Sequence, residues 1–266
     1  MDKTVTFRKK IIHYSIEGNG KPVLLLHGFG EDKYIWKDQV INLQKKHLVI
    51  IPDLPGTGKS DLLEGDNIQI SDYADCIKAI IIQEKIKSFV MIGHSMGGYI
   101  VLAYFKKYQK DLSGLGLFHS HAFADSEIKI TIRKKAISFI NTNGGSAFLK
   151  LSTPELFHNL PTCNHAMALL LQNGKSFNKK TLIQYYDAMA MRTSTILELS
   201  EAQIPVLLIV GQYDKTMPFN ELISQSYLPK QTHLYILRNT GHMGMIEEAE
   251  KSTTILTNFL NHINII

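Results

Sequence analysis

The sequence predicts an α/β fold in which a mostly parallel sheet is flanked by helices and carries a helical insertion. Three observations support this fold class. Short apolar runs that end in glycine recur along the chain, as in KPVLLLHG at residues 21–28. Helical patterns alternate with these runs, which is the order that parallel sheets produce. The alternation stops between residues 121 and 200, where only helical patterns are found.

Each element is justified by its local pattern. Two alternating stretches open the chain as a strand pair, and later strands are buried apolar runs. We expect strands within residues 3–8, 10–16, 21–28, 47–56, 88–94, 112–120, 204–214 and 232–237. We expect helices within residues 34–44, 71–86, 96–108, 127–141, 147–151, 165–172, 179–199, 219–225 and 246–261. The predicted domains are a core of residues 1–120 and 201–266 and a helical cap of residues 121–200.

Composition limits the classes of function. Apolar residues make up 44% of the 266 residues and charged residues 20%, which is typical of a soluble globular protein. The net charge is +5, but the basic residues are mostly scattered lysines, so we expect no nucleic-acid partner. Cys76 and Cys163 have neither disulfide-framework nor metal-ligand spacing. No apolar run is long enough to span a membrane, and we expect a cytoplasmic protein.

The stretch DLPGTGKS at residues 53–60 ends like a nucleotide-binding phosphate loop. Such a loop requires glycine five residues before its Gly-Lys-Ser ending, and that position is Asp53. A carboxylate there would repel the phosphate, and Pro55 removes a backbone N–H group that would bind it. We therefore expect a structural turn after a strand.

The stretch GHSMG at residues 93–97 lies between a buried strand and a helix. A Gly-x-Ser-x-Gly pattern in this context is a nucleophile elbow, in which a strained turn exposes the serine hydroxyl. The helix that follows directs its N–H groups toward the reacting oxygen. Ser95 is the predicted nucleophile.

A serine nucleophile requires a base and an acid that orients the base. His242 follows the apolar run that ends at residue 237, and Asp214 follows the run that ends at residue 210. Both are expected at the carboxyl ends of strands, where sites form in parallel sheets. Asp125 is an alternative acid after the preceding strand.

The oxyanion formed during acyl transfer requires two N–H donors. We expect one from Met96, the residue after the nucleophile, and one from the HGFG loop of residues 27–30. Phe29 is the preferred donor there, with Gly28 as the alternative, whereas His27 is expected to pack the loop. His119 and His121 resemble a metal pair, but no third ligand has useful spacing, so we expect neither metal nor cofactor.

From about Pro22 onward the chain resembles the α/β-hydrolase superfamily. The matching motifs are HGFG, DLPGTGKS, GHSMGG, IPVLLIVGQYD and NTGHMGMIEE. The resemblance implies a sheet of about eight strands with an inserted cap, and it places DLPGTGKS at the turn after a core strand, near the oxyanion loop. The chain looks like small capped serine carboxylesterases and 3-oxoadipate enol-lactonases. Serine at the nucleophile position separates it from dehalogenase and epoxide-hydrolase relatives.

These observations predict a serine hydrolase that cleaves carboxylic esters of small to medium size through an acyl-enzyme. Enol-lactone, thioester or C–C bond cleavage and a ligand sensor that retains the triad are the alternatives. The expected partner is a small-molecule ester or lactone, and the expected state is a monomer or homodimer. Arg133 or Arg192 could anchor a substrate carboxylate. The substrate pocket is expected under the cap, lined by Phe123, Phe139, Leu156, Met189 and Arg192.

Overall fold

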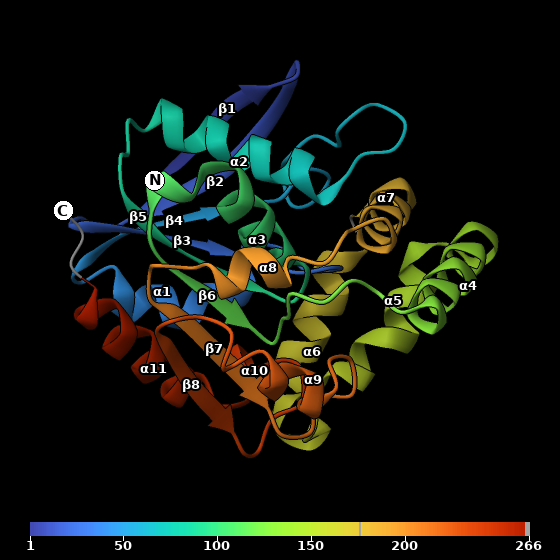
Figure 1. The fold of residues 1–266 in the computed structure, drawn as a ribbon. Coiled ribbons are helices and arrows are strands. Elements are labelled where there is room, and N and C mark those ends of the chain that lie inside the picture. Colours follow the sequence, from blue (N-terminus) through green and yellow to red (C-terminus); the bar gives the residue numbers. More distant parts are fainter. Residues whose placement is uncertain (176, 264–266) are drawn as a thin grey trace.

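The computed structural model describes residues 1–175 and 177–263. They form one eight-stranded sheet of order β1-β2-β4-β3-β5-β6-β7-β8, which confirms the predicted fold class (Figure 1). Strands β1 and β2 are antiparallel to their neighbours, and the six others run parallel. The strands are β1 (Asp2–Phe7), β2 (Lys10–Glu17), β3 (Lys21–Leu26), β4 (His47–Pro52), β5 (Phe89–His94), β6 (Leu112–Phe118), β7 (Val206–Gly211) and β8 (Thr232–Leu237).

Helices cover both faces of the sheet. Side chains alternate between the faces along each strand, so Leu24 and Leu26 join one apolar cluster while Val23 and Leu25 join the other. The first cluster includes residues of α2 and α3, and the second includes residues of α1 and α11. The core helices are α1 (Lys37–Leu43), α2 (Ile70–Gln83), α3 (Met96–Tyr108), α9 (Phe219–Ser224), α10 (Gly244–Glu247) and α11 (Ala249–His262).

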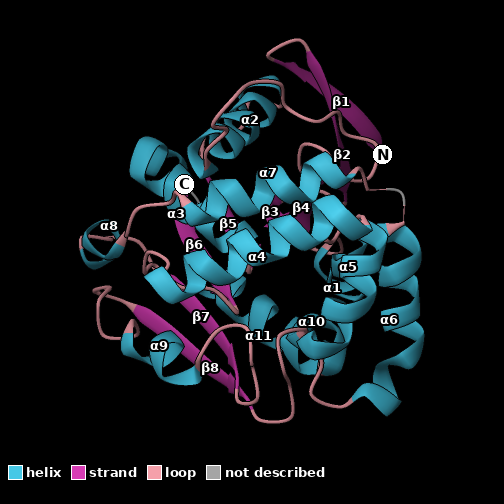
Figure 2. Cartoon of the chain, turned by 90° about the vertical axis from the view of Figure 1, so that its right-hand side faces the viewer, coloured by secondary structure: helices cyan, strands magenta, loops and turns pink. Residues whose placement is uncertain are grey.

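The chain between β6 and β7 forms helices, which we call the insertion (residues 121–200). Figure 2 shows its helices α4 to α7 gathered in front of the sheet, at the side where the parallel strands end. The helices of the insertion are α4 (Glu127–Asn143), α5 (Gly145–Ser152), α6 (Leu160–Gly174), α7 (Lys179–Ala190) and α8 (Ile196–Ser200).

The single helix predicted over residues 179–199 is two helices, α7 and α8. Between them, the Arg192 side chain turns back to donate to the carbonyl oxygens of Met189 and Phe123. The backbone N–H of Thr195 donates to the Ala122 carbonyl at 2.8 Å. These contacts with the start of the insertion replace helical hydrogen bonds, and a sequence periodicity cannot reveal them.

The DLPGTGKS turn is a docking point for α7. Tyr185 donates its hydroxyl to the Pro55 carbonyl at 2.9 Å, and Thr181 donates to the Gly56 carbonyl at 3.1 Å. The Asp53 carboxylate occupies the inside of the turn, where a Cβ at Gly58 would overlap it. The turn is therefore filled by its own carboxylate, which leaves no room for a phosphate and fits a structural turn.

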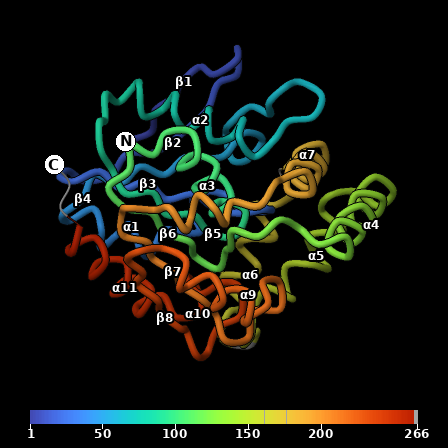
Figure 3. The backbone as a smooth tube through the Cα atoms, in the orientation of Figure 1, coloured from blue at the N-terminus to red at the C-terminus, as the bar shows by residue number. Residues whose placement is uncertain are grey.

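The N-terminus and the end of α11 lie on the left of Figure 3, away from α4 and α5 on the right. Helices α4 and α5 of the insertion therefore lie on the opposite side of the molecule from both ends of the described chain. Among the described residues, no helix combines the length and apolar character needed to cross a membrane.

Candidate active site

Ser95 lies at the turn between β5 and α3, and its backbone is strained. Its φ of 51° and ψ of −117° place it in a region that L-residues rarely adopt. The flanking glycines permit this turn, since a Cβ at Gly97 would lie 2.6 Å from the His27 carbonyl oxygen and one at Gly93 would overlap the Gly97 backbone. The hydroxyl of Ser120 donates to the Ser95 carbonyl at 2.8 Å and helps to hold the turn in place.

His242 and Asp214 lie together although 28 residues separate them. His242 Nδ1 donates to Asp214 Oδ2 at 2.7 Å. The other carboxylate oxygen, Oδ1, accepts the N–H groups of Thr216 and Met217 at 2.8 Å each. Burial favours the neutral acid, but the neighbouring His242 and His119 outweigh it and lower the pKa of Asp214. The ionised carboxylate therefore holds His242 with Nε2 free to act.

Asp125, the alternative acid, has another role. Its carboxylate binds Arg133 through two hydrogen bonds and Arg192 Nη1 at 2.6 Å, and its side chain is 2% exposed. The acid on His242 is Asp214.

His119 is a second histidine beside Asp214, and its sequence pattern did not predict this position. Its Nδ1 lies 3.2 Å from Asp214 Oδ2, and its buried Nε2 has no hydrogen-bond partner among the described residues. Burial lowers the pKa of His119 to about 4, so the ring is neutral at neutral pH. Its position directly after β6 was the available signal.

Metal binding was predicted to be absent because His119 and His121 lacked a third ligand. Among the described residues, potential ligand atoms of His119, Asp214 and His242 lie within 4.8 Å of one another, and His121 is not part of this group. Asp214 Oδ2 and His242 Nδ1 already hydrogen-bond to each other, so a cation there would replace that bond. The arrangement fits proton transfer by His242 better, and the absence of a metal remains a prediction.

In the loop after β3, the N–H groups of Gly28 and Phe29, the two candidate donors, differ in whether they already have an acceptor. Gly28 donates its N–H to Glu31 Oε2 at 2.6 Å. By contrast, the N–H groups of Phe29 and Met96 have no acceptor within residues 1–175 and 177–263. His27 packs the loop as expected, because its Nε2 accepts the Leu54 N–H at 3.0 Å. These contacts favour Phe29 over Gly28 as a donor to a substrate oxyanion.

Sequence reasoning missed a buried ion pair behind this loop. His94 Nδ1 lies 3.0 Å from Glu31 Oε2, and His94 Nε2 lies 2.9 Å from the carbonyl oxygen of His242. Both ring nitrogens therefore act as donors, which requires the imidazolium form. Burial favours the neutral ring, but Glu31 outweighs it and raises the pKa of His94. One ion pair thus links the loop after β3 to the backbone of His242.

Ser95 and His242 line one cavity of about 300 Å³ between the core and the insertion. Of the predicted pocket residues, Leu156 and Met189 line it. Phe123, Phe139 and Arg192 do not, which corrects the prediction for these three. Phe139 lies six residues beyond Arg133 on α4 and therefore on another face of the helix, where it packs against Phe148. Sequence reasoning missed Lys129, Tyr186 and Met217, which also line the cavity.

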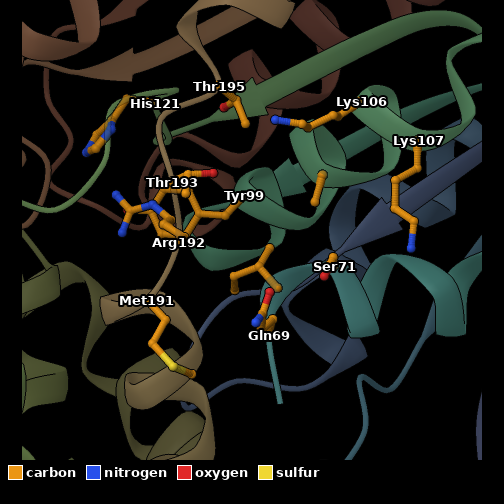
Figure 4. Close-up of a pocket in the computed structure, with 12 residues that line it drawn as sticks. Gln69, Ser71, Tyr99, Lys106, Lys107, His121, Met191, Arg192, Thr193 and Thr195 are labelled. Atoms are coloured by element: carbon orange, nitrogen blue, oxygen red, sulfur yellow. The ribbon is translucent and has the colours of Figure 1, made fainter. Parts of the chain in front are cut away.

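Arg192 instead lines a second cavity of about 330 Å³ beside α2 and α3. Figure 4 shows its guanidinium group next to Tyr99, and the distance from its Cζ atom to the ring centroid is 3.8 Å. The lysines of α3 in this view are also paired, since Lys106 binds Glu198 at 2.6 Å and Lys107 binds Asp75. The cations around this second cavity therefore have partners already.

Comparisons with known proteins agree with this architecture. The sequence model of a family described as the alpha/beta hydrolase fold matches residues 21–128. The AB hydrolase superfamily protein YisY of Bacillus subtilis is 24% identical, and the alignment covers 92% of this chain and 93% of YisY. A thermophilic esterase from Thermogutta terrifontis, solved with malate bound, is 26% identical with a TM-score of 0.90 over 98% of both chains. The enol-lactonase from Burkholderia xenovorans shares the fold, with a TM-score of 0.90, 20% identity and coverage of 98% of this chain and 100% of that one.

Proposed function

The chain belongs to the α/β-hydrolase superfamily, and on that premise we propose that it is a serine hydrolase that cleaves carboxylic esters through an acyl-enzyme. One observation carries the proposal. A strained serine lines a cavity together with a histidine whose Nδ1 is fixed by a buried carboxylate. This arrangement supplies a nucleophile, a base and an orienting acid in one place.

In the proposed reaction, Ser95 Oγ attacks the acyl carbonyl carbon while His242 Nε2 takes the hydroxyl proton. The N–H groups of Phe29 and Met96 bind the resulting oxyanion. The C–O bond to the leaving alkoxide then breaks, and His242 returns the proton to that oxygen. Water, activated by His242, attacks the acyl-enzyme, which releases the carboxylic acid and restores Ser95. Asp214 stabilises the imidazolium in both halves of the reaction.

The cavity supports substrates of small to medium size, because its 300 Å³ is at the lower end of the range for ligand pockets. Lactones remain an alternative, because opening a cyclic ester needs the same groups. The esterase and the enol-lactonase among the structural relatives are consistent with either substrate. We favour open-chain esters because the relative with the higher identity is the esterase.

A fluorophosphonate probe and a panel of 4-nitrophenyl esters and lactones test the proposal. The probe should label the wild-type protein once, and Ser95→Ala should abolish labelling and lower kcat by about 10⁴-fold or more. The matched control is Ser113→Ala in β6, whose hydroxyl has no partner among the described residues and whose loss should leave labelling intact. Labelling that persists in Ser95→Ala would refute the assignment. Ligand-induced stabilisation of wild type without turnover would favour a sensor.

A further inference from the structure

Resting on the proposed function, we propose that Lys129 forms a subsite for a carboxylate carried by the substrate. The preferred substrates would then be half-esters of dicarboxylic acids, in which one carboxyl is esterified and the other is free. Nothing in the serine machinery requires such a group, so the subsite concerns substrate choice and not the chemical step.

Lys129 lies on the wall of the cavity that the insertion supplies. On α4, Lys129, Ile132 and Arg133 share one face because they are three and four residues apart, and all three line the cavity with Ser95. Lys129 Nζ donates to the Thr216 carbonyl at 3.0 Å. Thr216 also donates its N–H to Asp214, so this lysine lies near the catalytic groups. Figure 2 shows α4 crossing in front of the sheet on this side.

The charges around Lys129 do not balance. No carboxylate lies within ion-pair distance of Lys129 Nζ in residues 1–175 and 177–263. Arg133 and Arg192 share the carboxylate of Asp125, and the second carboxylate that acts on Lys129, that of Asp214, is held by His242, so three cations here face two anions. His121 adds no charge, because burial and the nearby Arg192 lower its pKa to about 3.

The acidic residues that line the cavity are committed elsewhere. Glu31 binds His94, and Glu155 binds Lys215 at 3.3 Å. Burial, together with the charge of Arg133, outweighs Asp125 and Asp214 and lowers the pKa of Lys129, so these two carboxylates compensate the ammonium only in part. A substrate carboxylate would supply the missing anion.

Free donors are present on this wall. The Lys129 ammonium has three N–H donors and uses one on the Thr216 carbonyl. Arg133 uses Nε and Nη2 on Asp125, and its Nη1 has no acceptor among the described residues. The competing explanation is that Lys129 only tethers α4 to the loop of residues 214–217. The two explanations predict different results when Lys129 is replaced. Loss of a subsite lowers kcat/KM only for substrates that carry a carboxylate, whereas loss of a tether lowers it for charged and neutral substrates alike.

The test compares mono-(4-nitrophenyl) glutarate with its neutral methyl ester in wild type and Lys129→Met. We expect the variant to lose about 10- to 100-fold in kcat/KM for the acid, which is the range of a charge-assisted hydrogen bond, and less than about 3-fold for the methyl ester. Lys129→Arg should recover part of the preference. The matched control is Lys134→Met on the exposed face of α4, which should leave kcat/KM unchanged for both substrates.

An equal loss for both substrates would show that Lys129 is only a tether and would overturn the subsite. Wild type without a preference for the acid in the succinate, glutarate and adipate series would overturn it as well.

A readout without turnover separates this inference from the proposed function. Monomethyl glutarate should raise the Tm of wild type and of Ser95→Ala but not of Lys129→Met. If no ester is cleaved but this shift is seen, the proposed function fails and the subsite stands. Absence of the shift in wild type would contradict the subsite.

Discussion

The Ser95 cavity has a core wall and an insertion wall, formed by side chains of the core and of the insertion, and the charged groups of the two walls are paired differently. On the core wall, each charged group has its own partner: Asp214 holds His242, and Glu31 holds His94. On the insertion wall, Arg133 shares the carboxylate of Asp125 with Arg192, which lines the second cavity, and Lys129 has only a carbonyl oxygen. The core wall is thus preorganised before a substrate arrives, as the proposed catalysis requires. The insertion wall keeps a charge that a ligand can neutralise.

The largest effect on stability is expected at Asp125. Asp125→Asn would leave the charges of Arg133 and Arg192 without a counterion. Water cannot compensate for this loss, because the two side chains are only 7% and 6% exposed. We expect the free energy of unfolding to fall by about 3–5 kcal/mol, as for other broken buried ion pairs. Urea denaturation followed by circular dichroism measures it.

The matched control is Glu198→Gln, which removes the partner of Lys106, a side chain that is 50% exposed. Its effect should stay below about 1 kcal/mol. If Asp125→Asn and Glu198→Gln destabilise the protein equally, the shared carboxylate is not the anchor of the insertion wall.

The sequence predicted the core wall better than the insertion wall, and the reason is physical. Ser95, Asp214 and His242 each follow a parallel strand, and parallel strands bring their carboxyl ends to one edge whatever the loops contain. The insertion has no such rule. The break between α7 and α8 depends on Arg192 reaching Phe123, which is 69 residues away.

The Glu31–His94 pair could be found only in the structure, whereas Lys129 could have been predicted from the sequence. Glu31 and His94 lie 63 residues apart, and each resembles an ordinary loop or turn residue in the sequence. Lys129 could have been found, because it shares a helical face with Arg133, which was already a candidate for binding a carboxylate. Lys129 was missed because only arginines were considered as residues that could bind a carboxylate.

The next effect in size is expected on the core wall. Glu31→Gln keeps an oxygen acceptor for Gly28 but removes the charge that keeps His94 protonated, so one of the two donor bonds of His94 is lost. We expect a loss of about 1–3 kcal/mol in the free energy of unfolding. Because His94 supports the backbone of His242, kcat should fall while KM changes little.

The pH dependence sharpens this prediction. Burial opposes ionisation of Glu31, but His94 outweighs it and lowers the pKa of Glu31, so its contribution is complete above its ordinary pKa of 4.5 and is lost as the pH falls. The pKa of His94 is raised, so its contribution is complete below 6.5 and is lost as the pH rises. The stability difference between wild type and Glu31→Gln should therefore be largest between pH 4.5 and 6.5. A difference that is constant from pH 4 to 9 would contradict the ion pair.

The smallest effect is expected at Lys59, in the turn that joins the two walls. Its side chain is exposed and has no hydrogen-bond or ion-pair partner among the described residues, and only its backbone N–H reaches the Asp53 carboxylate, at 3.4 Å. Lys59→Ala should change the free energy of unfolding by less than about 0.5 kcal/mol and leave ester turnover intact. The contrasting variant is Gly56→Val, because Gly56 has a φ of 93° and a Cβ there would lie 2.6 Å from Thr181 Oγ1. Since that contact joins the core to α7, Gly56→Val should destabilise the fold although it alters no charge. Loss of turnover in Lys59→Ala would mean that this lysine, and not only the shape of the turn, contributes to the reaction.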